Sequence, residues 1–163
     1  MASEGLLIVY HSRTGGAGQM ARAAFEGAEG EGPCRLLRAC EAQPGDMLAA
    51  RGYIFCAPEN LAALSGEMKE FFDRCYYPLL GEIEGRAYAQ MVCAGSDGQN
   101  AIRQIARIAQ GWRLKPVQEP VLVCTHAQSR AAIEAPKRIG EEDLERCREL
   151  GQGMGAGLAM GAF

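Results

Sequence analysis

The sequence predicts a three-layer α/β fold in which a five-stranded parallel sheet carries helices on both faces. Two observations predict it. Short apolar runs alternate with helical segments five times along the chain, and the run at 52–57 is continuously apolar, as expected of a parallel strand buried on both faces. The chain has 163 residues and no recognisable linker, so we expect a single domain over residues 1–163.

Each strand prediction rests on a short run of strand-forming residues between chain breaks. The predicted strands are residues 6–10, 34–38, 52–57, 87–93 and 120–124. Arginines interrupt the second run, which favours a place near an edge of the sheet. Pro58 and the lack of alternation after it predict a loop over residues 58–64.

The helices are predicted from apolar periodicity and from residues that start or end a helix. The predicted helices are residues 19–26, 44–50, a segment from Ser65 to near Pro78, 101–112 and a last helix beginning near Glu141. Ser65 is the candidate N-cap of the third, with Met68 where an acid would complete a capping box. Small residues at 151, 155 and 159 of the last helix predict either close packing against the sheet or a frayed end.

Bulk composition excludes several classes of protein. A net charge of -3 without a basic run argues against nucleic acid as a partner. The seven cysteines form no CxxC pair, so we expect no metal site and buried, unreactive thiols at Cys56, Cys93 and Cys124. This cysteine usage suits a reducing, cytoplasmic location. We find no signal peptide and no apolar run near the roughly 20 residues that cross a bilayer, so no membrane association is expected.

The stretch after the first strand predicts an anion site. Residues 11–18 combine two hydroxyl side chains, one guanidinium and three glycines, and a helix follows them. The start of a helix offers unpaired backbone N–H groups and the positive end of the helix dipole, and glycines let an anion come close to the backbone. We therefore expect this loop to hold a phosphate.

Two known phosphate loops were compared with it. The Walker loop is excluded because no Gly-Lys-Ser/Thr is present. Residues 16–21 do match the dinucleotide fingerprint GxGxxA, with Glu41 as the candidate ribose acid, but five residues separate the strand from its first glycine. Ser12, Thr14 and their neighbours suit a terminal phosphate monoester better, and the dinucleotide alternative stays open.

Polar loops follow the first, third and fourth predicted strands, at residues 11–18, 58–64 and 94–99. In open parallel sheets, ligands bind beyond the carboxyl ends of the strands, where the strand order reverses. A strand order of 2-1-3-4-5 would bring all three loops to one edge of the sheet. The agreement of the three loops predicts one ligand site between them.

Two segments make the chain recognisable. Ser12-x-Thr14-Gly15 resembles the FMN-phosphate loop of the flavodoxin family, and residues 58–60 with 65–74 resemble the second flavin loop and its helix in flavodoxin-like NAD(P)H-dependent oxidoreductases. The resemblance covers nearly the whole chain. It implies a flavodoxin-like fold of order 2-1-3-4-5, bound FMN, NAD(P)H as electron donor and redox chemistry at the isoalloxazine ring.

Carried over by position, the resemblance implies three groups of FMN-binding residues and no metal. The phosphate would be surrounded by Ser12, Arg13, Thr14, Gly15, Gly16 and Ala17. The ring would be lined by Pro58, Glu59, Asn60 and Leu61, largely through backbone groups, and closed on its pyrimidine side by Gly95, Ser96 and Asp97. No side chain is assigned as a catalytic acid or base, because the flavin carries the electrons. We expect His11 to be structural and His126 to be a solvated loop residue.

The chain departs from the family pattern in two ways. Ala17 stands where a threonine is common, and the ring loops hold no aromatic residue. An open ring face favours an oxidoreductase that reduces a quinone or similar small acceptor. A flavodoxin-like electron carrier with a redox partner protein, and a relative that has lost FMN, are the alternatives. Packing is the expected role of Tyr76, Tyr77 and Trp112, unless a homodimer brings one of them to its partner's ring.

Overall fold

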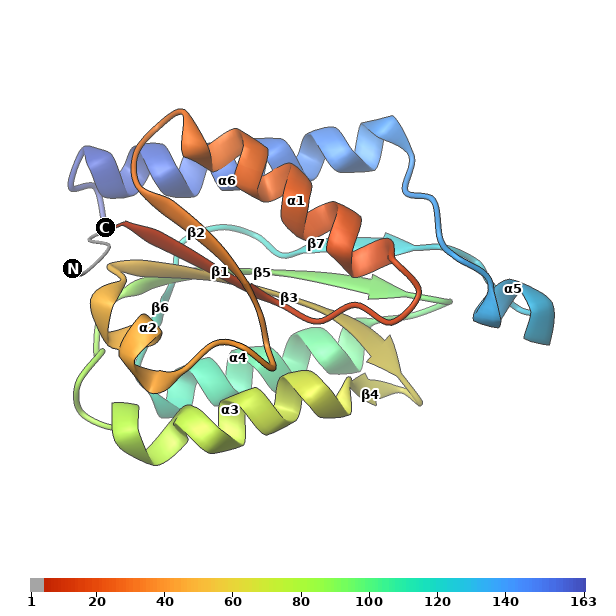
Figure 1. Cartoon of the computed structure of the whole chain (residues 1–163), viewed down its shortest axis with the longest axis horizontal. Coiled ribbons are helices and arrows are strands. Elements are labelled where there is room, and N and C mark those ends of the chain that lie inside the picture. The colour runs from red at the N-terminus through yellow and green to blue at the C-terminus, as the bar shows by residue number, and fades with distance from the viewer. Residues whose placement is uncertain (1–4) are drawn as a thin grey trace.

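A parallel sheet between two layers of helices forms the frame of the protein (Figure 1). The computed structural model describes residues 5–163. The strands are β1 (Leu6–Tyr10), β2 (Cys34–Arg38), β3 (Gly52–Asn60), β4 (Ala63–Leu64), β5 (Ala87–Ala94), β6 (Lys115–Pro116) and β7 (Val121–Cys124). The helices are α1 (Gly16–Glu29), α2 (Pro44–Ala49), α3 (Gly66–Leu79), α4 (Gln99–Gly111), α5 (Arg130–Glu134) and α6 (Glu141–Ala159).

The expected strand order is confirmed. The path through the sheet is β2-β1-β3-β5-β6, and β7 also pairs with β5. β6 pairs in parallel with the start of β5 and β7 with its end, so the fifth position of the sheet is filled by two short pieces. The sequence predicted only the second piece. β2 lies at the opposite edge, as its arginines indicated.

Side chains that alternate along the central strands build two separate cores. From β1, Leu7 and Val9 face the core under α3 and α4, whereas Leu6 and Ile8 face the core under α1 and α6. Burial on both faces explains why these strands consist mostly of apolar residues, with Gln90 of β5 a buried polar exception. Trp112 is fully buried in the first core, so its role is packing.

The first helix begins earlier than predicted. α1 starts at Gly16 instead of residue 19, because Gly15 adopts a φ of 98° as its N-cap and its carbonyl accepts a hydrogen bond from the Gln19 N–H at 3.1 Å. The GxGxxA match therefore lies inside the helix and not in a turn before it. Glu41, the ribose acid of the dinucleotide alternative, binds Arg38 instead.

The predicted loop over residues 58–64 is wrong in part. β3 continues through Pro58 to Asn60, and β4 returns antiparallel to it, with Asn60 opposite Ala63. Pro58 fits the strand because its carbonyl, and not its missing N–H, is used: it accepts a hydrogen bond from the Ser65 N–H at 3.2 Å. We refer to residues 58–64 as the ring hairpin.

The capping box predicted at Ser65 does not form. Ser65 is the N-cap of α3, but its hydroxyl makes no capping bond; Ser65 Oγ lies 2.8 Å from Nδ1 of His11. The buried Ser65 thereby links the start of α3 to the end of β1.

The small residues of the last helix are closely packed, but against α1 and not against the sheet as predicted. A Cβ on Gly151 of α6 would lie 1.9 Å from the carbonyl oxygen of Ala24 in α1, and one on Gly27 of α1 would lie 2.0 Å from that of Arg148. Only glycine permits this approach of the two helices, and α6 continues to Ala159 without fraying. No helix within residues 5–163 has the length and apolarity to cross a bilayer.

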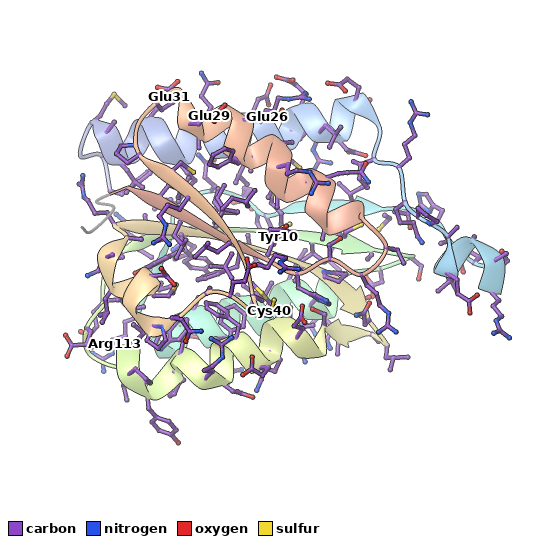
Figure 2. All side chains as sticks on the ribbon, viewed as in Figure 1. Tyr10, Glu26, Glu29, Glu31, Cys40 and Arg113 are labelled. Carbon is purple, nitrogen blue, oxygen red and sulfur yellow. The ribbon has the colours of Figure 1, made fainter. Side chains whose placement is uncertain are left out.

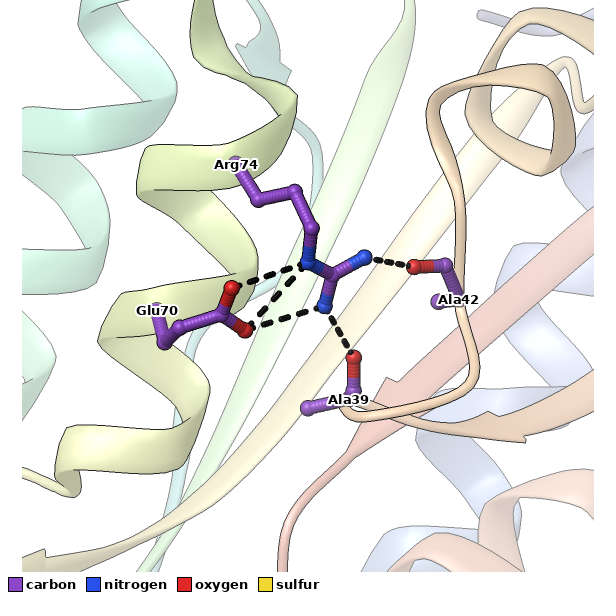
Figure 3. A network of polar contacts seen from close by, with 4 residues as sticks. All are labelled: Ala39, Ala42, Glu70 and Arg74. Atoms are coloured by element: carbon purple, nitrogen blue, oxygen red, sulfur yellow. Dashed lines mark hydrogen bonds and ion pairs between the residues drawn. The ribbon is translucent and has the colours of Figure 1, made fainter.

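On the face of the sheet opposite to α1 and α6, α3 holds the connection that follows β2 (Figure 3). Arg74 of α3 donates hydrogen bonds to the carbonyl oxygens of Ala39 and Ala42, and Glu70, one turn earlier, accepts from the same guanidinium at 2.9 Å. The chain after β2 is therefore fixed in place although it has no regular structure.

Candidate flavin site

The three polar loops meet at one cavity. The cavity has a volume of about 770 Å³ and lies at the carboxyl ends of β1, β3 and β5, where the strand order reverses. This volume falls within the range of about 300–1,000 Å³ that is typical of small-molecule sites. We call it the flavin cavity. Eleven of the thirteen residues predicted from sequence line it: Ser12, Arg13, Thr14, Gly16, Ala17, Pro58, Glu59, Asn60, Leu61, Gly95 and Ser96.

The loop of residues 11–17, which we call the phosphate loop, is shaped to hold an anion. Gly15 turns the chain with its positive φ, and its N–H donates a hydrogen bond to Ser12 Oγ at 3.2 Å. No side chain caps α1, so the first backbone N–H groups of this helix point out of its end without an intrahelical acceptor. Together with Arg13, these donors fit the phosphate of FMN, so the residues present suit the cofactor that the resemblance implies.

Ala17 does not spoil this fit. Its methyl group is buried at the cavity wall, and its carbonyl accepts a weak hydrogen bond from the thiol of Cys56 at 3.3 Å. The missing hydroxyl removes one donor, whereas the N–H groups of the helix start do not depend on the side chain at this position.

The ring hairpin forms the second wall. Leu61 and Ala62, at its tip, both have a left-handed backbone, with φ of 53° and 59°. Within residues 5–163 their N–H groups have no hydrogen-bond partner, so these groups are free to bind a ligand. The Leu61 side chain is fully exposed.

Glu59 has a role in addition to the one expected. It lines the cavity, but its carboxylate accepts hydrogen bonds from the backbone N–H groups of Gly98 at 2.9 Å and Ala101 at 3.3 Å. It thereby caps α4 and ties the ring hairpin to the loop of residues 95–98.

Two predicted residues lie outside the cavity lining. Gly15 faces a neighbouring cavity and acts through its backbone angle. Asp97 accepts a hydrogen bond from the Gln99 N–H at 3.3 Å and so shapes the start of α4. Contact of any of the thirteen residues with FMN remains a prediction.

The sequence missed one wall of the cavity. The segment after β7 contributes Thr125, Ala127, Ile133, Glu134 and Lys137, and α5 lies within it. The segment is fixed to the phosphate loop: the Lys137 N–H donates to the Thr14 carbonyl at 2.8 Å, and the Gln19 side chain donates to the Lys137 carbonyl at 2.8 Å and accepts from the Ile139 N–H at 3.0 Å. The end of β7 at this edge of the sheet was the one sequence signal for this wall. The long-range hydrogen bonds of Gln19 have no signal in the sequence.

The titratable groups near the cavity agree with a site that works through its cofactor. Burial raises the pKa of the Cys93 thiol to about 11, so this cavity-lining thiol stays protonated and unreactive. His11 bridges Ser65 and Glu67, and its pKa is lowered mainly by burial, with the Glu67 carboxylate opposing that shift. His126 is exposed and does not line the cavity. No cluster of metal-ligating side chains occurs within the described part of the chain.

Comparisons with known proteins agree with this geometry. A sequence model of the family described as NADPH-dependent FMN reductase matches residues 12–129. A flavodoxin of Aquifex aeolicus (strain VF5) is 32% identical over 162 residues, which cover 95% of this chain and 87% of that protein.

Solved structures show the same fold. An archaeal flavodoxin superposes with a TM-score of 0.76 at 17% identity, covering 94% of this chain and 97% of its own. A flavodoxin described as WrbA-like, from Agrobacterium tumefaciens, superposes with a TM-score of 0.71 at 22% identity, covering 98% and 99%. The fold is thus flavodoxin-like, and the chain belongs to the NADPH-dependent FMN reductase family of FMN-binding flavoproteins.

Proposed function

We propose that the protein is an NAD(P)H-dependent oxidoreductase that reduces a quinone or a similar small acceptor through bound FMN. The observation that carries the proposal is the openness of the flavin cavity. Its walls at the ring hairpin and at residues 94–96 are aliphatic or polar, and within residues 5–163 no aromatic side chain lines it. A flat ring bound there keeps a face on which a nicotinamide or an acceptor can stack.

The chain's own contribution is to bind and to orient. The phosphate loop anchors one end of the cofactor, while Pro58 and Leu61 supply aliphatic contacts to the other. FMN held there would supply two-electron redox chemistry between NAD(P)H and the acceptor, with one proton drawn from solvent for each quinone reduced. The free N–H groups of Leu61 and Ala62 would act by donating hydrogen bonds to the ring.

Spectroscopy and kinetics test the proposal. The purified protein, loaded with FMN, is expected to be yellow and to bleach when NADPH or NADH is added without oxygen. Steady-state turnover is then measured with a panel of quinones and other small acceptors. The proposal fails if neither nucleotide supports turnover with any acceptor.

A flavodoxin-like electron carrier is the second candidate, because the 32% identical relative is described as a flavodoxin. A carrier would be reduced only by a partner reductase. Stepwise redox titration distinguishes the two: a carrier gives two well-separated one-electron potentials, whereas the proposed oxidoreductase gives a single two-electron step.

A further inference from the structure

A second cavity lies beside the flavin cavity, on the other side of the phosphate loop. Its volume is about 520 Å³, and its walls come from the carboxyl ends of β1 and β2 and from the starts of α1 and α3. We call it the basic cavity. Ser12 and Arg13 line both cavities, so the two adjoin at the phosphate loop.

The charge of this lining is one-sided. Arg13, Arg22 and Arg38 reach it from three separate segments, and Glu67 is the single acidic residue among its lining residues. Glu67 is engaged by His11 at 3.1 Å. Within residues 5–163, Arg13 and Arg22 have no hydrogen-bond or ion-pair partner. Arg38 pairs only with the exposed Glu41, a contact that contributes little.

This concentration of positive charge contrasts with the chain as a whole, whose net charge is -3. On α1 itself, Glu26, Glu29 and Glu31 lie at or just beyond the far end of the helix (Figure 2), whereas Arg22 lies nearer its start, at the cavity. Three guanidinium groups, of which only Arg38 is paired with a carboxylate, are an arrangement suited to binding a phosphate group.

The walls of the cavity are held in place. The Arg74 hydrogen bonds to the carbonyls of Ala39 and Ala42 fix the chain directly after Arg38 (Figure 3). The same connection carries Cys40, and half-buried Tyr10 ends β1 on the same side of the molecule (Figure 2). The cavity thus combines fixed cations with one aromatic side chain.

We propose that the basic cavity binds the adenosine 2′-phosphate end of NADPH; this rests on the proposed oxidoreductase function. The dianionic phosphate monoester pairs with Arg22 and Arg38, and Tyr10 offers an aromatic face to the adenine. Because the two cavities share Ser12 and Arg13, one dinucleotide can reach from here to a nicotinamide stacked in the flavin cavity.

The same chemistry predicts discrimination between the two nucleotides. NADH carries a hydroxyl where NADPH carries the phosphate, and a ribose hydroxyl pair is best held by a carboxylate, whereas arginine accommodates the 2′-phosphate. Arg22 and Arg38 therefore act on NADPH and leave NADH largely unaffected.

Binding to the FMN-loaded full chain tests the site without turnover. Calorimetry with adenosine 2′,5′-bisphosphate is expected to show binding that Arg22→Ala and Arg38→Ala each weaken at least tenfold and that Arg22→Glu abolishes. Adenosine 5′-monophosphate, which lacks the 2′-phosphate, should bind weakly and be insensitive to Arg38→Ala. Arg107→Ala is the matched control, because Arg107 is an exposed arginine of α4 remote from this cavity.

Kinetics supply the second readout. In Arg22→Ala and Arg38→Ala the ratio of kcat/KM for NADPH to that for NADH is expected to fall at least tenfold, with the NADH value unchanged. Equal bisphosphate binding by the wild type and all three cavity variants would overturn the proposal. Bisphosphate binding that depends on Arg22 and Arg38, together with no turnover of either nucleotide, would retain the anion site, refute its assignment to an electron donor and contradict the proposed function.

Discussion

The phosphate loop and the ring hairpin form two walls of the flavin cavity and reach a left-handed backbone in different ways. The phosphate loop uses Gly15, for which a φ of 98° carries no steric cost. The ring hairpin uses Leu61 and Ala62, each of which is strained by about 1–2 kcal/mol in this conformation. A type I′ hairpin turn requires positive φ at both of its central residues, and Asn-Gly would supply it at lower cost.

The strained hairpin is held by hydrogen bonds to side chains of α4 and by the carboxylate of its own residue Glu59. Asn100 Nδ2 donates to the Ala62 carbonyl at 2.7 Å, and Gln104 Oε1 accepts from the Leu64 N–H at 2.7 Å. Glu59 adds its bonds to Gly98 and Ala101. The phosphate loop is also held by long-range bonds, from Lys137 to Thr14 and from Gln19 to residues 137–139, but its left-handed residue is a glycine and needs no restraint. The left-handed turn is therefore a local preference in one wall and is imposed by tertiary contacts in the other.

The largest effect on FMN affinity is expected from replacing Gly15, the residue that favours the left-handed turn of the phosphate loop. Gly15→Val places a β-branched residue at a φ of 98°, so either the unfolding free energy drops by about 2 kcal/mol or the loop rearranges and loses phosphate donors. We expect FMN affinity to fall about 100-fold, measured by fluorescence titration of the apoprotein. Gly30→Ala is the control, since Gly30 has a φ of -76° and open space around its Cβ position. Unchanged affinity in Gly15→Val would show that the phosphate loop does not depend on this turn.

A smaller effect is expected from releasing the restraint on the ring hairpin. Glu59→Ala removes the acceptor of two backbone N–H groups, which costs about 1 kcal/mol of stability, as for a lost helix cap. The hairpin then moves relative to α4, and FMN affinity falls about tenfold. Glu59→Gln keeps one oxygen and should lie between the wild type and Glu59→Ala in both urea denaturation and FMN titration. A larger loss in Glu59→Gln than in Glu59→Ala would contradict the capping role.

The same difference explains how far the sequence could be interpreted. The strands, their order and the phosphate loop could be predicted from local composition, because apolar runs and glycines determine the structure of the segments that contain them. Pro58 was misleading: a proline normally ends a strand, but here its carbonyl is the group that pairs. The hairpin turn at Leu61 and Ala62 contains no glycine, asparagine or aspartate, so no turn signal marks it.

Long-range contacts account for what remained hidden. Gln19 binds a segment 118 residues away, and nothing in its neighbourhood signals this. Glu59 was expected to line the ring, and it also caps a helix that begins about forty residues later in the chain. Sequence-local reasoning identifies the loops of this site but not the side chains that fix one loop to another.

The strain itself can be tested by relieving it. Leu61→Gly removes the steric cost at a φ of 53°, and because the leucine side chain is fully exposed, little buried area is lost. The flexibility that glycine gives the unfolded chain offsets part of this gain, so we expect a net stabilisation of about 0.5 kcal/mol. Urea denaturation of the apoprotein measures it. A destabilised Leu61→Gly would mean that the side chain contacts the fold in solution.

The smallest expected effect concerns His11, which links the phosphate loop to the start of α3, directly after the ring hairpin, by contacting Ser65 and Glu67. Burial, opposed by Glu67, lowers the pKa of His11 below its ordinary value, so below about pH 6.5 the unfolded chain binds more protons than the folded one. Stability is therefore fully present above that pH and declines as the pH falls toward the lower folded-state pKa, with a slope of at most about 1.4 kcal/mol per pH unit. Urea denaturation from pH 7.5 to 5 should show this decline in the wild type, and His11→Asn, which cannot titrate, should show a shallower one. Parallel curves for the two proteins would place the pH dependence elsewhere and leave His11 as a hydrogen-bonding link alone.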